Sequence, residues 1–170
     1  MRKHYEQQRR FDCTPIAELT LNLGCRDEVI PVLAGLQHVY TCHSLRRRVV
    51  QLVAEDINQE TRRDVGRPGL DDWQVVVLAS VRLGCHYDYD KLQDQAENHH
   101  SLRTLLGLGD WDTTDFSARR IRDTLCQLKP ETLAAINQAV VSHGQELQPN
   151  AAASVRADSF VVETNIHYPT

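Results

Sequence analysis

The feature that most constrains the fold is an apolar run at residues 73–83, with the sequence WQVVVLASVRL. Its apolar side chains fall on nearly every side of a helix, so a helix here must be buried among other elements. Asp71 or Asp72 is suited to cap the start of this helix, and Gly84 is suited to end it in the left-handed conformation. A strand is the alternative for VVVLASV, but the flanking caps favour a helix. We therefore expect a buried central helix with several others packed around it.

Helical signals recur along the rest of the chain. Residues 28–40 begin with acidic side chains that suit a helix start, and residues 45–57 follow Ser44, a candidate N-cap. Further helices are expected at residues 88–98, at 102–108 behind Ser101, at 116–128 behind a cap at Thr114 or Asp115, and at 130–147 with Pro130 in the first position. The sequence therefore predicts a mainly α fold with a multi-helix N-terminal region.

The two ends of the chain differ from this helical middle. Residues 1–26 are polar and irregular, which indicates an N-terminal arm before a helical domain at 27–148. Residues 149–170 begin as a linker, and the β-branched and aromatic run at 155–166 predicts a strand. Because a lone strand cannot satisfy its own ladder hydrogen bonds, we expect its partners in another chain or in sequence beyond Thr170. Truncation of a longer protein is the simpler of these two interpretations.

Composition indicates a globular protein of the cytoplasm. The hydrophobic fraction is 41% and the charged fraction 25%, and no apolar run approaches the roughly 18–20 residues that cross a bilayer. The five cysteines form an odd, widely spaced set, which favours reduced thiols. The net charge of −4 argues against nucleic-acid binding, but phosphate contacts need only local basic clusters. Residues 1–67 carry 11 Lys and Arg against 9 Asp and Glu, so charge is unevenly distributed.

Arginines in the expected helix at 116–128 are the first candidate for DNA contact, and they are Arg119, Arg120 and Arg122. A short turn separates this helix from the preceding one, an arrangement compatible with a helix-turn-helix. The alternative is a solvated helix face on which these arginines pair with nearby aspartates. Two further basic groups are Arg46, Arg47 and Arg48, and Arg62, Arg63 and Arg67.

Other polar groups give weaker signals. His38, Cys42 and His43 are partly co-facial on a helix, but a structural zinc site needs four ligands and only Cys25 is a remote fourth. Ordinary packing is the preferred interpretation. The acidic groups are expected to act as helix caps and turn formers, and they are Asp71 with Asp72, and Asp110 with Asp112 and Asp115.

The last residues of the chain carry a resemblance to a known family. Residues 157–170 read ADSFVVETNIHYPT, which resembles the DSFVVET-x-[VI]-HYPT signature of bacterial insertion-sequence transposases of the DDE type. Two earlier parts are similar to the helical and N-terminal regions of the same group. They are GRPG at 66–69 with DWQV at 72–75, RLG at 82–84, DYDKL at 88–92 and residues 99–107, and Phe11 with PI at 15–16 and VLAGLQH at 32–38. Because their order and spacing agree, the resemblance spans nearly the whole chain.

The resemblance implies a role for Asp158. In this family the signature opens an RNase H-like catalytic domain, and Asp158 matches the first of three carboxylates that hold Mg²⁺. The two metal ions activate the attacking water or 3′-hydroxyl and stabilise the leaving oxygen. The family's second Asp and its Glu have no counterparts after Asp158, and Glu163 would face the opposite side of an ideal strand. Asp158 would therefore bind Mg²⁺ only in a complete domain.

The resemblance implies an N-terminal fragment of a bacterial transposase that binds the terminal inverted repeats of its element but does not catalyse transposition alone. It implies a cytoplasmic, nucleoid-associated location. Three alternatives remain: a DNA-binding regulator derived from a transposase, a helical interaction module whose strand completes another subunit's sheet in a homo-oligomer, and a frameshifted protein whose remainder comes from a second reading frame.

Overall fold

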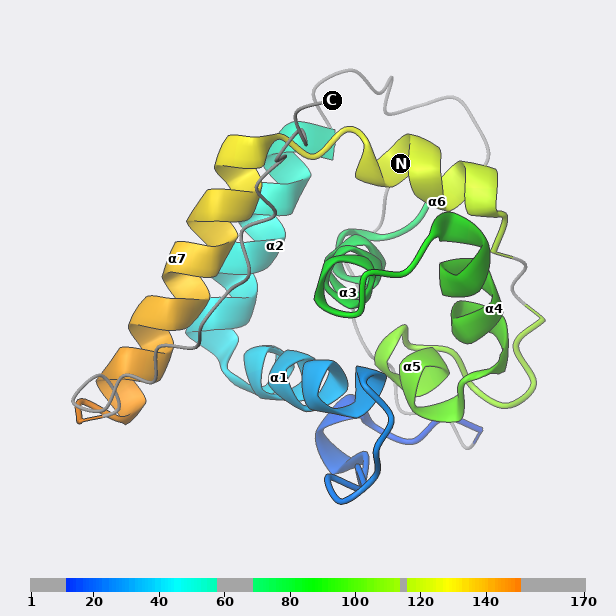
Figure 1. Ribbon diagram of the computed structural model, residues 1–170, viewed down its shortest axis with the longest axis horizontal. Coiled ribbons are helices and arrows are strands. Elements are labelled where there is room, and N and C mark those ends of the chain that lie inside the picture. The colour runs from blue at the N-terminus through cyan, green and yellow to red at the C-terminus, as the bar shows by residue number, and fades with distance from the viewer. Residues whose placement is uncertain (1–11, 58–68, 114–115, 151–170) are drawn as a thin grey trace, which may run out of the picture.

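The computed structural model describes residues 12–57, 69–113 and 116–150 (Figure 1). Across these three ranges the chain forms a 3₁₀ turn and seven α-helices, with no strand, which confirms the mainly α fold. The predicted strand at 155–166 lies outside the described residues, as do Asp158, Glu163 and the basic residues Arg62, Arg63 and Arg67. No described helix has both the length and the apolar character needed to span a bilayer.

Helix α3, Asp72–Gly84, is the buried centre of the fold, as its apolar run predicts. It contacts α1, α2, α4 and α6, which surround it in Figure 1. Its side chains with 0–1% exposure are Trp73, Val75, Val77, Leu78 and Val81. Because these positions cover several sides of the helix, no single neighbour could bury them.

The start of α3 is fixed by the capping box that its sequence allows. Asp71 is the N-cap: its Oδ1 accepts a hydrogen bond from the Gln74 backbone N–H at 2.7 Å, and Gln74 Oε1 accepts one from the Asp71 N–H at 3.1 Å. Asp72, the other candidate, is the first residue of the helix. The Gln74 Nε2 also donates to the Leu106 carbonyl at 3.2 Å, which joins α3 to the end of α5.

The prediction that Gly84 ends α3 in the left-handed conformation is wrong. Gly84 is the last helical residue, and His86 has the positive φ of 53°. The Tyr87 N–H then donates to the Arg82 carbonyl at 3.1 Å, as in a Schellman motif. Gly84 has a packing role instead, because a Cβ there would lie 3.0 Å from Val32 Cγ2 of α1.

Helices α1, Val29–Thr41, and α2, His43–Ile57, are separated by Cys42 alone. The Cys42 carbonyl accepts from the Arg46 N–H at 2.8 Å, so α2 begins before Ser44. The predicted N-cap at Ser44 is therefore wrong. Only Cys42 separates the two helices, so Ser44 already lies inside α2. The apolar stripe of α2 is buried at Leu45, Val49, Val53 and Ile57.

Helix α4, Tyr89–Asn98, begins at the Asp88 cap, close to its predicted bounds. Helix α5, His100–Leu105, is capped by His99, whose Nδ1 accepts from the Leu102 N–H at 3.2 Å, so the predicted cap at Ser101 is wrong. Gly107, with φ 75°, closes α5, and the Leu108 N–H donates to the Arg103 carbonyl at 3.0 Å. This glycine supplies the left-handed residue that the motif requires.

Helix α6, Ala118–Leu125, is shorter than the predicted helix at 116–128, and Ser117 occupies its N-cap position. The predicted caps, Thr114 and Asp115, lie outside the described residues. Helix α7, Pro130–Leu147, begins at Pro130 as predicted and packs mainly on α2. It contains no buried residue, which is unusual for a helix of this length.

The described part of the N-terminal arm packs against α1. Its 3₁₀ turn, Ile16–Glu18, buries Ile16 and is followed by the buried Leu19. Gln37 of α1 donates through Nε2 to the Ile16 carbonyl at 2.9 Å and to the Leu19 carbonyl at 2.7 Å. This segment therefore belongs to the helical unit rather than forming a separate arm.

The capping carboxylate of α3 makes a testable contribution to pH dependence. Burial raises the pKa of Asp71 to about 6, and the charge of Asp72 acts in the same direction. An unfolded aspartate has a pKa of about 3.9, so the folded state binds more protons between about pH 4 and 6, and the free energy of unfolding falls as the pH rises through that window. We expect Asp71→Asn, which can still cap α3, to reduce this fall by on the order of 2–3 kcal/mol in urea denaturation.

Asp88→Asn, at the exposed cap of α4, is the matched control for this experiment. It should leave the decline between pH 4 and 6 as steep as in the unsubstituted chain. An equally steep decline in Asp71→Asn would show that another group is responsible.

Candidate functional site

The candidate nucleic-acid contact lies on the outer face of α6. Its inner face buries Ile121, Thr124 and Leu125, and the helix packs on α4 and α3. Gln93 of α4 fixes its first turn, because Gln93 Oε1 accepts a hydrogen bond from the Ala118 N–H at 2.8 Å. The helix that carries the arginines is therefore held at a defined position on the fold.

Two of the three predicted arginines point away from this packed face. The side chains of Arg119 and Arg122 are 84% and 56% exposed. Both lie near Asp123: Arg119 Nε is 3.6 Å from its Oδ2, and Arg122 Nε is 3.7 Å from its Oδ1. One carboxylate therefore faces two guanidinium groups, which leaves a local excess of positive charge.

Arg120 differs from the other two arginines. It is half-buried and already makes an interaction within the chain. Adjacent positions on a helix are rotated by about 100°, so Arg120 cannot share a face with both of its neighbours. The structure thus brings Arg119 and Arg122 together and sets Arg120 apart.

Arg82 and Tyr89 lie beside α6 and extend the positive surface toward α3. The Arg82 guanidinium lies 4.4 Å from the centroid of the Tyr89 ring, and Tyr89 Oη is 3.7 Å from Cys126 Sγ. Burial is the main cause that raises the pKa of Tyr89, and its hydrogen bond with Cys126 acts in the same direction. The positive charges of Arg82 and Arg122 oppose this shift. The sequence did not mark Arg82 as a contact, because it is isolated from other basic residues along the chain.

The other described arginines of interest belong to α2. Arg46 lies 4.5 Å from the centroid of the Tyr40 ring, whereas Arg47 and Arg48 are exposed. Helix α2 begins beside the end of α1, away from α6 (Figure 1). These arginines form a second basic surface, separate from the one on α6.

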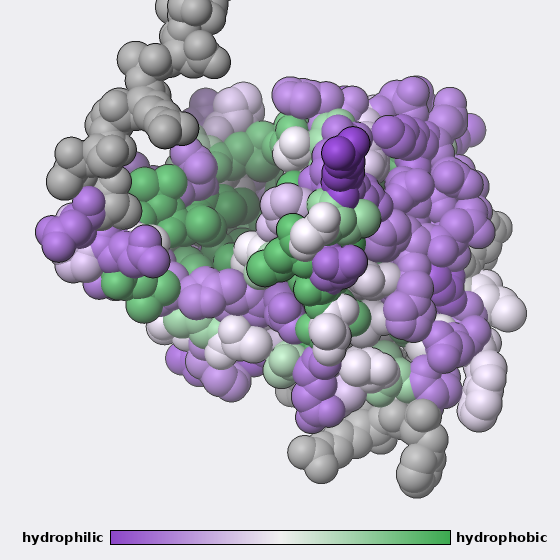
Figure 2. All heavy atoms as spheres, turned by 60° about the horizontal axis from the view of Figure 1, so that its bottom comes forward, coloured by the Kyte–Doolittle hydropathy of each residue, from purple (hydrophilic) through white to green (hydrophobic). Residues whose placement is uncertain are grey.

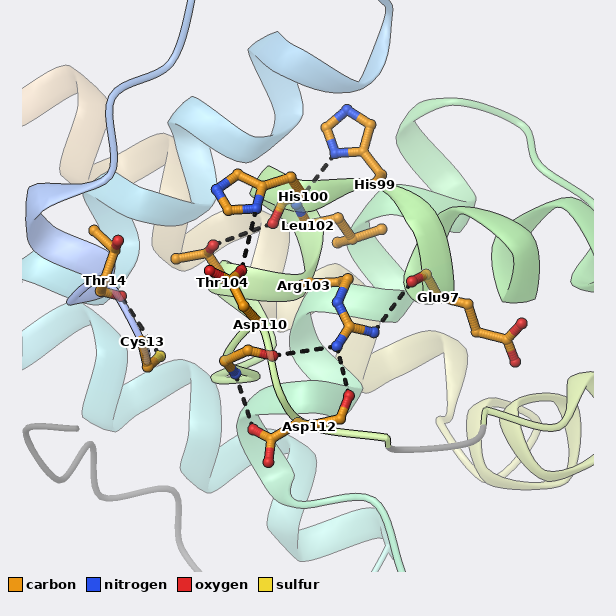
Figure 3. A network of polar contacts seen from close by, with 11 residues as sticks. Cys13, Thr14, Glu97, His99, His100, Leu102, Arg103, Thr104, Asp110 and Asp112 are labelled. Atoms are coloured by element: carbon orange, nitrogen blue, oxygen red, sulfur yellow. Dashed lines mark hydrogen bonds and ion pairs between the residues drawn. The ribbon is translucent and has the colours of Figure 1, made fainter. Parts of the chain in front are cut away.

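A hydrogen-bond network around Arg103 joins the end of α4 to residues 109–112, which follow α5 (Figure 3). Its guanidinium donates to three backbone carbonyls: Glu97 at 3.1 Å, Gly109 at 3.3 Å and Asp112 at 2.7 Å. Asp112 Oδ2 accepts from the Gly109 N–H at 2.8 Å, which confirms its predicted role as a turn former. The network fixes residues 109–112 relative to α4 and α5.

A small polar cavity of about 150 Å³ lies next to this loop. Residues 12–14 line one side, and His100, Thr104 and Asp110 line the other. His100 Nδ1 lies 3.7 Å from Asp110 Oδ1 (Figure 3). Because Asp12 and Asp110 both line it, the cavity is poorly suited to bind a phosphate.

Histidines of α1 and α7 meet on the other side of the molecule. His38 Nε2 and His143 Nε2 are 3.3 Å apart, and His143 Nδ1 lies 3.9 Å from Glu146 Oε2. Cys42, one turn after His38, has its Sγ 3.4 Å from Ser44 Oγ. Among the described residues, no three His, Cys, Asp or Glu side chains are arranged to hold a metal ion.

An apolar groove with a volume of about 250 Å³ lies between α3 and α7. One wall comes from α3, the other from α7, and Val53 of α2 also lines it. Figure 2 shows apolar atoms gathered in this hollow. The groove was not predicted, because it depends on how three helices separated in sequence are arranged.

Comparisons with protein-family models, with curated proteins and with solved structures find no match for this chain. The resemblance of residues 157–170 to DDE transposases therefore remains a prediction from the sequence.

Proposed function

We propose that this chain is the N-terminal DNA-binding region of a bacterial DDE-type transposase and that it binds the ends of its element through α6. The observation that carries the proposal is the pair Arg119 and Arg122, which are exposed on one helix and both lie near the single carboxylate of Asp123. Arg82 adds a third cation beside Tyr89. The family part of the proposal is supported by the sequence signature at residues 157–170.

The ion pairs on α6 are compatible with DNA binding. Exposed ion pairs contribute at most about 1 kcal/mol, so both guanidiniums can exchange Asp123 for a phosphate. Arginine donors match phosphate oxygens in a bidentate geometry, which favours arginine for this role. The predicted helix-turn-helix of α5 and α6 is wrong, because α5 ends at Leu105 and α6 begins at Ala118, a longer connection than the three or four residues of that motif. Helix α6 packs mainly on α4 and α3.

The catalytic part of the proposal concerns the terminal segment. We propose that residues 155–166 form the first strand of an RNase H-like domain and that Asp158 is its first Mg²⁺-binding carboxylate. Both lie outside the described residues. The described residues themselves do not fit a magnesium centre, because no three suitable ligands lie together among them. The proposed role of this chain is DNA binding in the bacterial cytoplasm.

The double substitution Arg119→Gln and Arg122→Gln tests the DNA contact. We expect it to weaken binding to duplexes carrying the element's ends by about tenfold or more, because each lost phosphate contact removes about one released counterion. The slope of log K against log salt should become shallower by about 2 for the same reason. Fluorescence anisotropy with labelled duplexes in a salt series measures both quantities.

The matched control is the double substitution Arg47→Gln and Arg48→Gln, which removes the same charge from the exposed face of α2. It should change the affinity by less than about threefold, since long-range effects of surface charges are screened. Equal losses in the two variants would show that binding follows net charge, and the assignment of the contact to α6 would then be wrong.

A further inference from the structure

The groove between α3 and α7 has two walls of helical side chains. The α3 wall presents positions on one face, Val76, Ala79, Ser80 and Leu83. The α7 wall presents Leu133, Ile136, Asn137 and Val140. Leu128, which lies just before α7 in the chain, also lines the groove. Most of this lining is apolar, and a hollow of about 250 Å³ is far larger than the roughly 30 Å³ share of one water molecule.

The side chains of this groove are incompletely covered. Leu83 is 49% exposed and Val140 is 38% exposed, and α7 has no buried residue along its whole length. Helix α7 packs mainly on α2, and the groove lies between its other side and α3. Apolar side chains arranged in this way along a groove are typical of a surface that receives another segment.

We propose that the segment directly after α7 occupies this groove, with the side chains of Phe160 and Val162 packed between α3 and α7. This placement does not depend on DNA binding by α6. It concerns the place of the terminal segment against the helical region, whether or not that segment also pairs with other strands.

The length of the connection allows this placement. Helix α7 ends at Leu147, and Val140 lies about 10 Å back along the helix axis. Residues 148–159 can span about 40 Å when extended, which is enough to reverse direction and reach any part of the groove. Residues 148–154, with the sequence QPNAAAS, carry mostly small side chains, which are compatible with a reversal of the chain direction after α7.

The sequence pattern of the segment fits one apolar surface. In an extended chain alternate residues share a side, so Phe160 and Val162 fall on one face with Asp158, Thr164 and Ile166, whereas Val161 and Glu163 fall on the other. The adjacent apolar pair Phe160 and Val162, which lies between Asp158 and Thr164 on this face, can therefore enter the groove while Glu163 remains in solvent.

A second copy of the chain is the main competitor for the groove. A tethered segment has an effective concentration in the mM range, whereas a separate chain at about 1 µM is roughly a thousandfold more dilute. If both bind the groove with equal intrinsic affinity, the segment of the same chain therefore occupies it.

Photo-crosslinking of the full chain tests this placement. With p-benzoylphenylalanine in place of Leu83, tryptic cleavage after Arg82, Lys91 and Arg156 should release peptide 83–91 joined to peptide 157–170. The same photoreactive residue in place of the 80% exposed Trp111 is the site control and should not join peptide 157–170. The yield from position 83 should be constant from about 1 to 100 µM protein, as expected for a tethered contact.

Two substitutions in the segment give an internal comparison. Phe160→Ser should lower the yield by about tenfold, because it removes the largest apolar side chain of the face placed in the groove. Val161→Ser, on the opposite face, should leave the yield within about twofold. Mixing isotopically labelled and unlabelled chains identifies links between chains. Links found mainly between chains, or no link to residues 157–170, would overturn the proposal.

Discussion

Trp73→Ala should lower the free energy of unfolding by about 3–5 kcal/mol, the largest loss expected from any single substitution in this chain. Trp73 is 1% exposed, its ring centroid is 5.1 Å from that of Tyr40, and its Nε1 donates to the Leu105 carbonyl at 2.8 Å. The substitution therefore leaves a cavity at the start of α3 and removes the donor from a carbonyl at the end of α5. Urea denaturation followed by circular dichroism at 222 nm gives the change without relying on tryptophan fluorescence.

Two variants separate the causes of this loss. Trp73→Phe keeps much of the ring but removes the donor, so its loss should be smaller, at about 1–3 kcal/mol. Trp111 is 80% exposed, and Trp111→Ala should change stability by less than about 0.5 kcal/mol. A Trp73→Ala variant within about 1 kcal/mol of the unsubstituted chain would contradict the central position of α3.

Arg103→Ala should lower the free energy of unfolding by about 3 kcal/mol, because three backbone carbonyls lose a charged donor together. These carbonyls belong to Glu97, Gly109 and Asp112, so the loss affects the end of α4 and the loop before α6. A Cβ at Gly109 would lie 2.7 Å from the Asp12 carbonyl oxygen, so the loop also packs closely against the N-terminal segment. The same denaturation experiment measures this loss.

Arg103→Lys is the informative comparison, because it retains the charge but cannot present the same planar set of donors. We expect it to recover less than half of the lost stability. Arg119→Ala, at an 84% exposed position with one surface ion pair, should cost less than about 0.5 kcal/mol. If Arg103→Lys were as stable as the unsubstituted chain, the geometry of the three hydrogen bonds would not matter.

The parts of the fold that local sequence determines were predicted well. The all-round apolar run predicted the central helix α3, with a cap at Asp71 or Asp72, and Pro130 marked the start of α7. The helix expected at 88–98 is observed as α4, Tyr89–Asn98. Each of these signals acts within one turn of helix, through a side-chain oxygen or a fixed φ angle. Their outcome depends little on what packs nearby.

The errors occurred where distant contacts or unusual caps decide the structure. Gly84 lies close to Val32 of α1 and does not form the left-handed turn, because His86 takes the positive φ. His99 caps α5 through a ring nitrogen, a role for which serine is the more common residue. Neither the neighbour of Gly84 nor the ring orientation of His99 can be inferred from adjacent residues.

The candidate site shows the same division between local and distant determinants. Helical periodicity places Arg119 and Arg122 three residues apart on one face, and they do share Asp123. It does not reveal that Arg82, from α3, lies beside Tyr89 next to the same helix. The groove between α3 and α7 is also a product of tertiary packing. The role of Asp158 remains a prediction from the signature, since it lies outside the described residues.

The affinity of the full chain for duplexes that carry the ends of its element, compared with scrambled duplexes of equal length, tests the central claim most directly. We predict tighter binding to the element's ends, with log K falling linearly as log salt rises between about 50 and 200 mM. Equal affinity for both duplexes, or no binding at about 50 mM salt, would contradict the proposal that this region recognises transposon ends.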